Sequence, residues 1–181
     1  LFAGNTVGLM VIREDGMLDV GAFRGAGADT LRAIYPLPVT RDSATGTAIL
    51  EQRMITYPDI DAPGVPPKAR EGCRAIGVGS AVFAPMLFEG RGIGVLWVGR
   101  STKGPFPEKQ VAQLKTFADQ AVIAIQNARL FNETKEALEQ RTATAEVLQV
   151  ISGALADPQP VFDKILDSCE RLFDSTGLGI Y

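Results

Sequence analysis

Cysteine is the residue type in this sequence best suited to nucleophilic or redox chemistry, and it occurs twice, at Cys73 and Cys169. The two lie too far apart in the sequence to indicate a metal-ligand pair or a disulfide framework. Arg70 and Arg74 could lower the pKa of Cys73, but a half-exposed cysteine on a short helix is more often structural than reactive. The sequence contains no histidine, which excludes Ser/His/Asp triads, His-ligated zinc or haem and imidazole catalysis. We therefore expect no catalytic residues, no metal site and no cofactor.

One glycine-rich segment invites comparison with a phosphate-binding loop. It spans 90–94 and reads Gly-Arg-Gly-Ile-Gly. A phosphate-binding loop carries a lysine and is followed by a helix, whereas apolar residues typical of a strand follow here. We interpret the segment as the turn of a β-hairpin.

The composition excludes several classes of partner. A formal net charge of -3 without a basic cluster gives no electrostatic footprint for nucleic acid or anionic lipid. No window approaches the roughly 20 uninterrupted apolar residues that a membrane span needs, so no membrane contact is expected within this segment. Unpaired cysteines are typical of a reducing compartment, and we expect a cytoplasmic protein.

Two sequence periods define the elements that position these residues. Alternating or continuous apolar runs bounded by glycine, proline and aspartate predict strands, and Asp42 or Ser43 is a suitable N-cap for a helix. The strands near the middle of the chain are apolar at nearly every position, which predicts a sheet buried on both faces. Strands are expected at 7–13, 17–24, 54–57, 80–88 and 93–99, and helices at 29–35, 43–52 and 68–75.

From Pro107 onward the apolar period lengthens to about 3.5 residues, which is typical of a helix. No proline or glycine interrupts the pattern until Gly153, so one helix can cover roughly 45 residues and extend about 70 Å. Beyond Leu130 polar residues interrupt the apolar seam, a pattern that favours a weak two-stranded coiled coil and hence a homodimer. The apolar positions in the first part are Val111, Leu114, Ala118, Ala121, Ile125 and Ala128.

The end of the sequence repeats its beginning. Asp157 and Pro158 end the long helix, and Pro160 can open another helix that runs to Phe173. Residues 172–181 then align without gaps on residues 1–10, because both stretches begin with Leu-Phe and end in apolar residues around a shared glycine. The chain is therefore expected to span one period of a repeat.

Three sets of segments resemble the GAF domain of bacterial multi-domain sensors. The first pairs Ser-Ala-Thr-Gly-Thr-Ala-Ile at 43–49 with Tyr-Pro-Asp-Ile at 57–60, and the second pairs Ser-Ala-Val-Phe-Ala-Pro-Met at 80–86 with Gly-Ile-Gly-Val-Leu at 92–96. The third is Phe-Ala-Asp-Gln-Ala at 117–121, continued by Ile-Gln-Asn-Ala-Arg-Leu at 125–130. The resemblance implies an α+β fold of the GAF/PAS-like type, in which helices flank a central antiparallel sheet of five or six strands. A ligand cavity would lie under the loops on one face, and a long C-terminal signalling helix would leave the domain.

The same resemblance implies a domain plan and a function. Residues 1–131 would form a GAF domain that lacks its N-terminal helix, 132–157 a linker signalling helix continuous with the last GAF helix, and 158–181 the first helix and first strand of a second copy. The linker is similar to those of histidine kinases and nucleotide cyclases. The expected function is non-catalytic: an unknown small molecule binds, and the helix relays the signal to a downstream kinase or cyclase domain of the same polypeptide. A ligand-free dimerisation spacer is the alternative.

GAF subfamilies with recognisable chemistry match this sequence only in part. Bilin-binding members have a cysteine commonly followed by histidine, whereas Cys73 is followed by Arg74. Free methionine-(R)-sulfoxide reductases have their reactive cysteine near the position of Cys73, but their second cysteine falls where this sequence has Thr45, so a dithiol cycle lacks its resolving thiol. A reductase that uses Cys73 stays open as a further alternative. The combined signature of cyclic-nucleotide-binding members is absent.

The resemblance also places the cavity. In the geometry of the family it would be lined from the second strand, the capped helix, the proline-rich loop and the central hairpin. Ordinary core packing is the alternative for each lining residue. Arg24 is the exception, because a charge that faces a cavity requires an anionic partner. The candidate ligand-binding residues are Phe23, Arg24, Ile49, Tyr57, Cys73, Val82 and Trp97.

Overall fold

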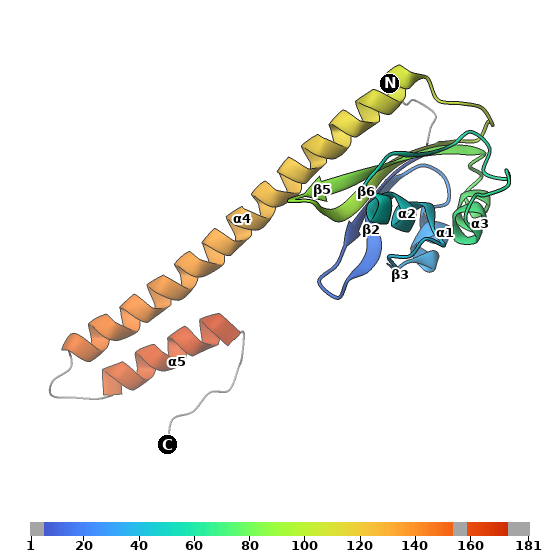
Figure 1. Ribbon diagram of the computed structural model, residues 1–181. Coiled ribbons are helices and arrows are strands. Elements are labelled where there is room, and N and C mark those ends of the chain that lie inside the picture. Colours follow the sequence, from blue (N-terminus) through green and yellow to red (C-terminus); the bar gives the residue numbers. More distant parts are fainter. Residues whose placement is uncertain (1–5, 154–158, 174–181) are drawn as a thin grey trace. The chain divides into compact units, whose positions relative to one another are not determined.

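The structure, a computed structural model, describes residues 6–153 and 159–173 (Figure 1). It contains two compact units, Leu1–Ile125 and Gln126–Tyr181, and one helix continues from the first into the second. The strand expected for a second copy, within 174–181, lies outside the described residues, as do residues 1–5 of the predicted repeat. The domain boundaries at 131 and 157 stay predictions.

The first unit contains a six-stranded antiparallel sheet with the strand order β3-β2-β1-β6-β5-β4. This sheet confirms the expected α+β fold. Two hairpins form where apolar runs flank turn residues, and the pattern does not predict the two-residue edge strand β3. The strands are β1 (Thr6–Ile12), β2 (Met17–Arg24), β3 (Leu37–Pro38), β4 (Ile55–Tyr57), β5 (Ser80–Phe88) and β6 (Arg91–Arg100).

Three short helices cover one face of the sheet, and the first part of a long helix covers the other (Figure 1). α2 begins where the sequence predicts, because Ser43 has an extended backbone and its Oγ accepts a hydrogen bond from the Gly46 N–H at 3.0 Å. α3 has Pro67 in its first turn. The N–H groups of a first turn have no acceptor within the helix, so the missing N–H of proline costs no helical hydrogen bond there. The helices are α1 (Ala28–Ile34), α2 (Ala44–Glu51), α3 (Pro67–Ala75) and α4 (Glu108–Gly153).

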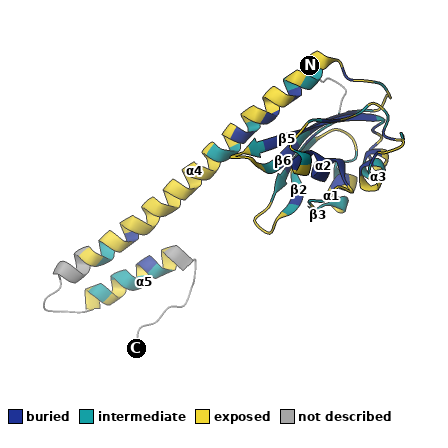
Figure 2. Cartoon of the chain, viewed as in Figure 1, coloured by how far each residue is buried: buried dark blue, intermediate teal, exposed yellow. Residues whose placement is uncertain are grey.

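The sheet is buried on both faces, as the nearly continuous apolar strands predict (Figure 2). Every residue of β5 from Ser80 to Met86 is buried. One core lies between the sheet and α1–α3, and a second lies between the sheet and α4. The first core includes Met10, Leu18, Ala48, Phe83 and Trp97, and the second includes Val82, Met86, Val98, Leu114, Ala118 and Val122.

The long helix α4 confirms the prediction of one uninterrupted helix that ends near Gly153. Its side chains from 127 to 142 are exposed throughout. Within the second unit, α5 (Gln159–Phe173) is tied to α4 by Glu146, which pairs with Arg171 at 2.7 Å and with Lys164 at 3.4 Å. No helix in the described part of the chain is long and apolar enough to cross a membrane.

Candidate functional site

A row of aromatic side chains crosses the sheet on the face covered by α1–α3. Backbone pairing places Phe23 beside Gly8, Gly8 beside Trp97, and Trp97 beside Phe83 on successive strands. The ring centroids of Trp97 and Phe83 lie 5.8 Å apart in a stacked arrangement, and those of Phe23 and Trp97 lie 6.1 Å apart. Such aromatic pairs contribute about 0.5–1.5 kcal/mol beyond the burial of their area. We call this row of Phe23, Trp97 and Phe83 the aromatic floor.

Gly8 allows the indole of Trp97 to lie across β1. A Cβ atom at residue 8 would stand 2.6 Å from Cε2 of the indole and still closer to Nε1, so any side chain at this position would displace the ring. A glycine inside a strand often marks such a close approach.

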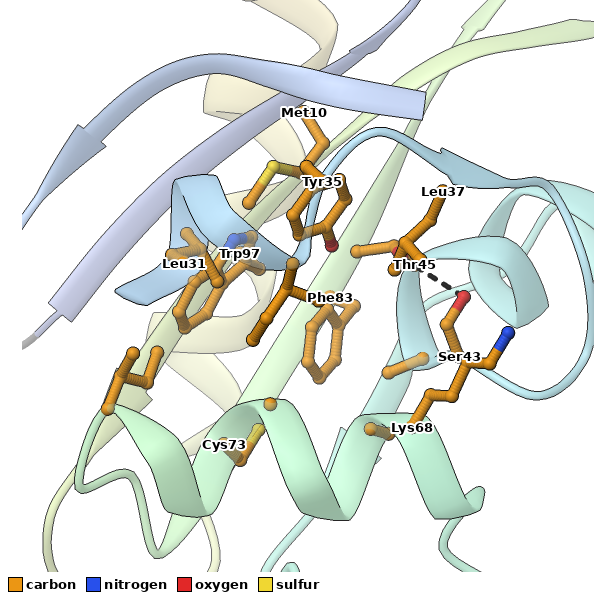
Figure 3. A pocket seen from close by; sticks show the side chains of 15 residues that line it. Met10, Leu31, Tyr35, Leu37, Ser43, Thr45, Lys68, Cys73, Phe83 and Trp97 are labelled. Carbon is orange, nitrogen blue, oxygen red and sulfur yellow. Dashed lines mark hydrogen bonds between the residues drawn. The ribbon is translucent and has the colours of Figure 1, made fainter. Parts of the chain in front are cut away.

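A small cavity lies between this floor and the helices α1, α2 and α3 (Figure 3). Its volume is about 50 Å³, which is room for a few water-sized groups at about 10–15 Å³ each and far less than the roughly 300 Å³ of a typical ligand pocket. The lining is mostly apolar. It consists of Met10, Leu31, Ile34, Tyr35, Leu37, Ser43, Ala44, Thr45, Lys68, Ala69, Gly72, Cys73, Ile76, Phe83 and Trp97.

Three hydroxyl groups form a connected chain beside the cavity. Thr45 Oγ1 donates to Ser43 Oγ at 3.3 Å (Figure 3), and Ser43 Oγ donates to the carbonyl of Thr40 at 3.4 Å. Tyr35 shares a side-chain hydrogen bond with Thr45. Burial raises the pKa of Tyr35, and the hydrogen bond with Thr45 only partly opposes this rise. The phenol is therefore neutral at physiological pH, and each of the three hydroxyls has a partner within the protein.

The indole of Trp97 lacks such a partner. Its side chain is 3% exposed, and its Nε1 is buried without a hydrogen-bond acceptor. In the described part of the chain, four buried side-chain nitrogen or oxygen atoms lack a hydrogen-bond partner. Of these four, Trp97 Nε1 is the one that belongs to a residue of the cavity lining. A buried donor without a partner costs about 1–3 kcal/mol. The indole N–H therefore lies unpaired over Gly8 of β1, within the aromatic row.

Cys73 reaches the cavity from α3, in an environment that suppresses formation of the thiolate. The residue is 7% exposed, so the expectation of a half-exposed cysteine is wrong. Burial raises the pKa of its thiol to about 12. The neighbouring arginines do not offset this rise, because both make their contacts elsewhere. Arg70 donates to two backbone carbonyls of the preceding loop, and Arg74 pairs with Asp61 at 2.7 Å.

Two of the residues proposed from the sequence, Cys73 and Trp97, line the cavity. The placement of Val82 requires correction, because this residue lies on the opposite face of the sheet in the core under α4. Successive side chains of a strand alternate between faces, and its neighbour Phe83 takes the cavity position. The strand is apolar on both faces, so the sequence pattern does not show which of the two residues faces the helices α1–α3.

The other proposed residues surround this core or lie outside it. Phe23 contacts Trp97 from β2, and Ile49 is buried in α2 within the same core, but neither lines the cavity. Tyr57 packs edge-on against Phe83 with ring centroids 6.1 Å apart. Arg24 is corrected as well: it is exposed at the end of β2 and does not line the cavity, so it requires no anionic partner there.

Sequence reasoning missed the contribution of α1 and of the residues that follow it. Leu31 and Tyr35 close the cavity from this side, and Thr45 provides a hydroxyl from the first turn of α2. The N-cap pattern at Ser43 was a usable signal for the position of Thr45. Nothing in the local sequence of α1 indicates that it covers the aromatic floor.

A family model described as "GAF domain" matches residues 3–126 of this chain. The chain belongs to the GAF domain family. The matched residues cover the six-stranded sheet, the helices α1–α3 and the part of α4 that packs on the sheet. The candidate site of this GAF domain is the cavity between its central sheet and the three short helices.

Solved structures agree on the GAF fold. A domain of a protein described as a two-component sensor histidine kinase from Sinorhizobium meliloti 1021 is 18% identical, with a TM-score of 0.60 and coverage of 72% of this chain and 84% of that chain. Part of a methyl-accepting chemotaxis protein is 26% identical, with a TM-score of 0.58 and coverage of 70% and 80%. The type II free methionine-R-sulfoxide reductase of Thermoplasma acidophilum is 21% identical, with a TM-score of 0.55 and coverage of 67% and 78%. The similarity to the kinase and to the reductase shows the fold alone. The search of curated proteins finds no match.

Proposed function

We propose that this GAF domain is a non-catalytic sensory module of a cytoplasmic signalling protein. A small molecule binds in the cavity above the aromatic floor, and α4 relays the change to a downstream kinase or cyclase domain of the same polypeptide. One observation carries the proposal: the two strands that provide the cavity floor also contact α4 through their alternate residues.

Neighbouring residues of β5 and β6 connect the two faces of the sheet. Phe83 and Trp97 form a cross-strand pair at the cavity, and the next pair, Val82 with Val98, lies in the core under α4. Leu114, Ala118 and Val122 of α4 pack in that core. Protein interiors are close-packed and transmit small displacements. A ligand that moves either aromatic ring therefore displaces the strands on which α4 rests.

The loop between β6 and α4 strengthens this connection. Arg100, at the end of β6, donates to the carbonyls of Gly104 and Pro105 at 2.8 and 3.1 Å. Its guanidinium carbon lies 3.9 Å from the ring centroid of Phe106, which is buried in the same core as α4. The start of α4 is thus tied to the end of β6, and a shift of the strand reaches the helix directly.

We further propose that α4 pairs with the same helix of a second copy. Leu130, Phe131 and Leu138 are 59%, 70% and 63% exposed, although each is a large apolar side chain. Alternating spacings of three and four residues, typical of a coiled-coil seam, connect Phe131, Thr134, Leu138, Arg141, Ala145 and Leu148. Thr134 and Arg141 are the polar residues of this seam, and they weaken any single pairing register of the two helices. A ligand with about 1–3 kcal/mol of differential binding can then select between registers.

Thermal unfolding with a panel of metabolites tests the binding step. We expect at least one compound to raise the Tm of the wild-type chain. Ala69→Met, which places a longer side chain at the cavity wall, is expected to abolish this rise. Glu71→Met is the matched control, because Glu71 is exposed on the same helix α3 and does not line the cavity. A rise that persists in Ala69→Met contradicts binding at this site.

A ligand-free dimerisation spacer is the second candidate, and the small cavity volume of about 50 Å³ favours it. A spacer needs only the packed sheet and the exposed apolar seam of α4. It predicts that no compound in the panel stabilises the chain and that Leu138→Glu nevertheless converts dimers to monomers in analytical ultracentrifugation. A stabilising compound that fails in Ala69→Met excludes the spacer.

The buried thiol of Cys73 supports the non-catalytic part of the proposal. Its pKa of about 12 leaves almost no thiolate at neutral pH, and Thr45, at the position of the second reductase cysteine, offers a hydroxyl instead. We expect no turnover of free methionine sulfoxide. Turnover that is lost in Cys73→Ser would establish the reductase alternative.

A further inference from the structure

We propose that the open edge of β4 binds an extended acidic peptide segment of a partner protein. The peptide adds a short strand to the sheet, and its carboxylate binds Arg41 and Arg53. The site is a surface hollow of about 360 Å³ beside β4, a volume within the roughly 300–1,000 Å³ of typical binding pockets. It shares no lining residue with the cavity under α1–α3. The proposal therefore goes beyond the proposed function and does not depend on it.

The hollow follows the edge of β4 rather than one of its faces. Its lining includes all three residues of the strand, Ile55, Thr56 and Tyr57. Successive side chains of a strand point to opposite faces, so a hollow that touches all three lies along the edge of the strand. Gly64 and Pro66, from the loop before α3, form part of its wall. Three strand residues span about 10 Å, the length of three residues of an added strand.

This edge of the sheet is free to pair. β4 is the last strand of the order β3-β2-β1-β6-β5-β4, and in the described part of the chain its backbone pairs with β5 alone. A sheet edge exposes backbone N–H and C=O groups that can bind an added strand. The opposite edge is poorly suited to this, because β3 contains Pro38, which has no N–H to donate. β4 has no proline and consists of β-branched and aromatic residues, which favour a strand.

Two arginines at the hollow favour an acidic residue in the added segment. Arg41 and Arg53 line the hollow, and their side chains are 71% and 65% exposed. Glu51 pairs with Arg53 at 2.6 Å, but its other oxygen lies 4.0 Å from Nε of Arg41, which is outside hydrogen-bond range. Within the described residues, the Arg41 guanidinium makes no hydrogen bond. A peptide carboxylate can therefore bind Arg41 without displacing Glu51.

The hydroxyl of Tyr57 offers a further donor beside these charges. Glu51 and Arg53 both act on the pKa of Tyr57, which places the phenol near them. Burial raises that pKa, and the Glu51 carboxylate adds to the rise, so the phenol stays protonated. The hydroxyl makes no hydrogen bond to any described residue. The lining thus presents unused donors, and its one carboxylate is already paired with Arg53.

Matched peptides test the proposal by NMR. The probe is acetyl-Val-Glu-Val-Glu-Val-amide, and the comparison peptide has lysine in place of both glutamates. We expect the acidic peptide to shift the backbone amide resonances of Ile55–Tyr57 with saturation, and the lysine peptide to bind at least about fivefold more weakly. An acidic peptide N-methylated at alternate residues keeps the charge but cannot pair as a strand, and it should not bind. Equal affinity for the lysine peptide or for the N-methylated peptide would overturn the proposal.

Charge-removing variants locate the binding groups. Arg41→Gln combined with Arg53→Gln should weaken binding of the acidic peptide about fivefold, because two exposed ionic contacts are lost. Arg32→Gln is the matched control: Arg32 on α1 is 67% exposed and does not line the hollow, so affinity should persist. Unchanged affinity in the double variant would contradict recognition by the arginines. Acetate that shifts the same amides at equal concentration would assign the hollow to small anions, and shifts that follow protein concentration alone would assign the edge to a second copy. Either result overturns the proposal.

Discussion

Adding one methyl group at Gly8 should destabilise the domain, whereas adding one at Gly72 should stabilise it. In Gly8→Ala, the new Cβ would stand 2.6 Å from Cε2 of Trp97, so the indole must move by roughly 1 Å to reach an ordinary contact distance. The ring is stacked on Phe83 and flanked by Phe23, which leaves it no free direction in the row. Overpacking of this kind costs about 1–3 kcal/mol, and the better strand propensity of alanine returns about 0.5–1 kcal/mol. We expect a net loss of about 1–2 kcal/mol.

Gly72→Ala is the matched control for this experiment. Gly72 lies inside α3, and a Cβ there meets no atom within 4 Å. Removing a glycine from a helix interior stabilises by about 0.5–1 kcal/mol. Urea unfolding followed by the fluorescence of Trp97 measures both variants. A Gly8→Ala protein as stable as the wild type would refute the placement of the indole across β1, whatever the behaviour of Gly72→Ala.

Three further outcomes follow from the buried thiol, the helix cap and the ion pairs of the second unit. At neutral pH, mass spectrometry should find alkylation of Cys169 long before that of Cys73, since burial raises the pKa of Cys73 to about 12; equal rates would contradict the burial. Ser43→Ala should lower the free energy of unfolding by about 1 kcal/mol because α2 loses its N-cap, and an unchanged midpoint would count against that cap. Hydrogen bonds from Arg171 and Lys164 hold the pKa of Glu146 below its ordinary 4.5. The ionised carboxylate therefore stabilises the packing of α5 on α4 above pH 4.5, and this stabilisation is lost as the pH falls through the lowered pKa. The protection factors of the α5 amides, which correct for the intrinsic exchange rate at each pH, should therefore fall on acidification. Glu146→Gln should remove that acid dependence; an unaltered acid response in the variant would contradict the pairing.

Apart from the two-residue edge strand β3, the elements of the GAF domain follow from local sequence, because each depends on a pattern of two or 3.6 residues. The apolar runs around Glu89 and Gly90 predict the β5–β6 hairpin, and Ser43 marks the start of α2. Helix α4 follows from the long stretch without proline or glycine before Gly153. These features involve residues close in the chain, and local propensity and burial agree on them.

The site could be predicted only in part, because it depends on which neighbours meet across strands. The sequence places Cys73 and Trp97 at the cavity, where the structure also has them, but it predicts Val82 where the structure has Phe83. A strand buried on both faces has no polar alternation, and an error of one residue moves a side chain to the other face. The role of Gly8 is likewise invisible in sequence, since it depends on a ring carried by a strand far along the chain.

The central claim is that the cavity and α4 are coupled through β5 and β6, and methyl NMR of the xenon-loaded chain tests it most directly. Met10 reports filling of the cavity, while Leu114 and Val122 report the packing of α4 on the far face of the sheet. We predict that xenon shifts the α4 methyl resonances with the same saturation curve as that of Met10. A saturating shift of Met10 with no change at Leu114 and Val122 would contradict the coupling.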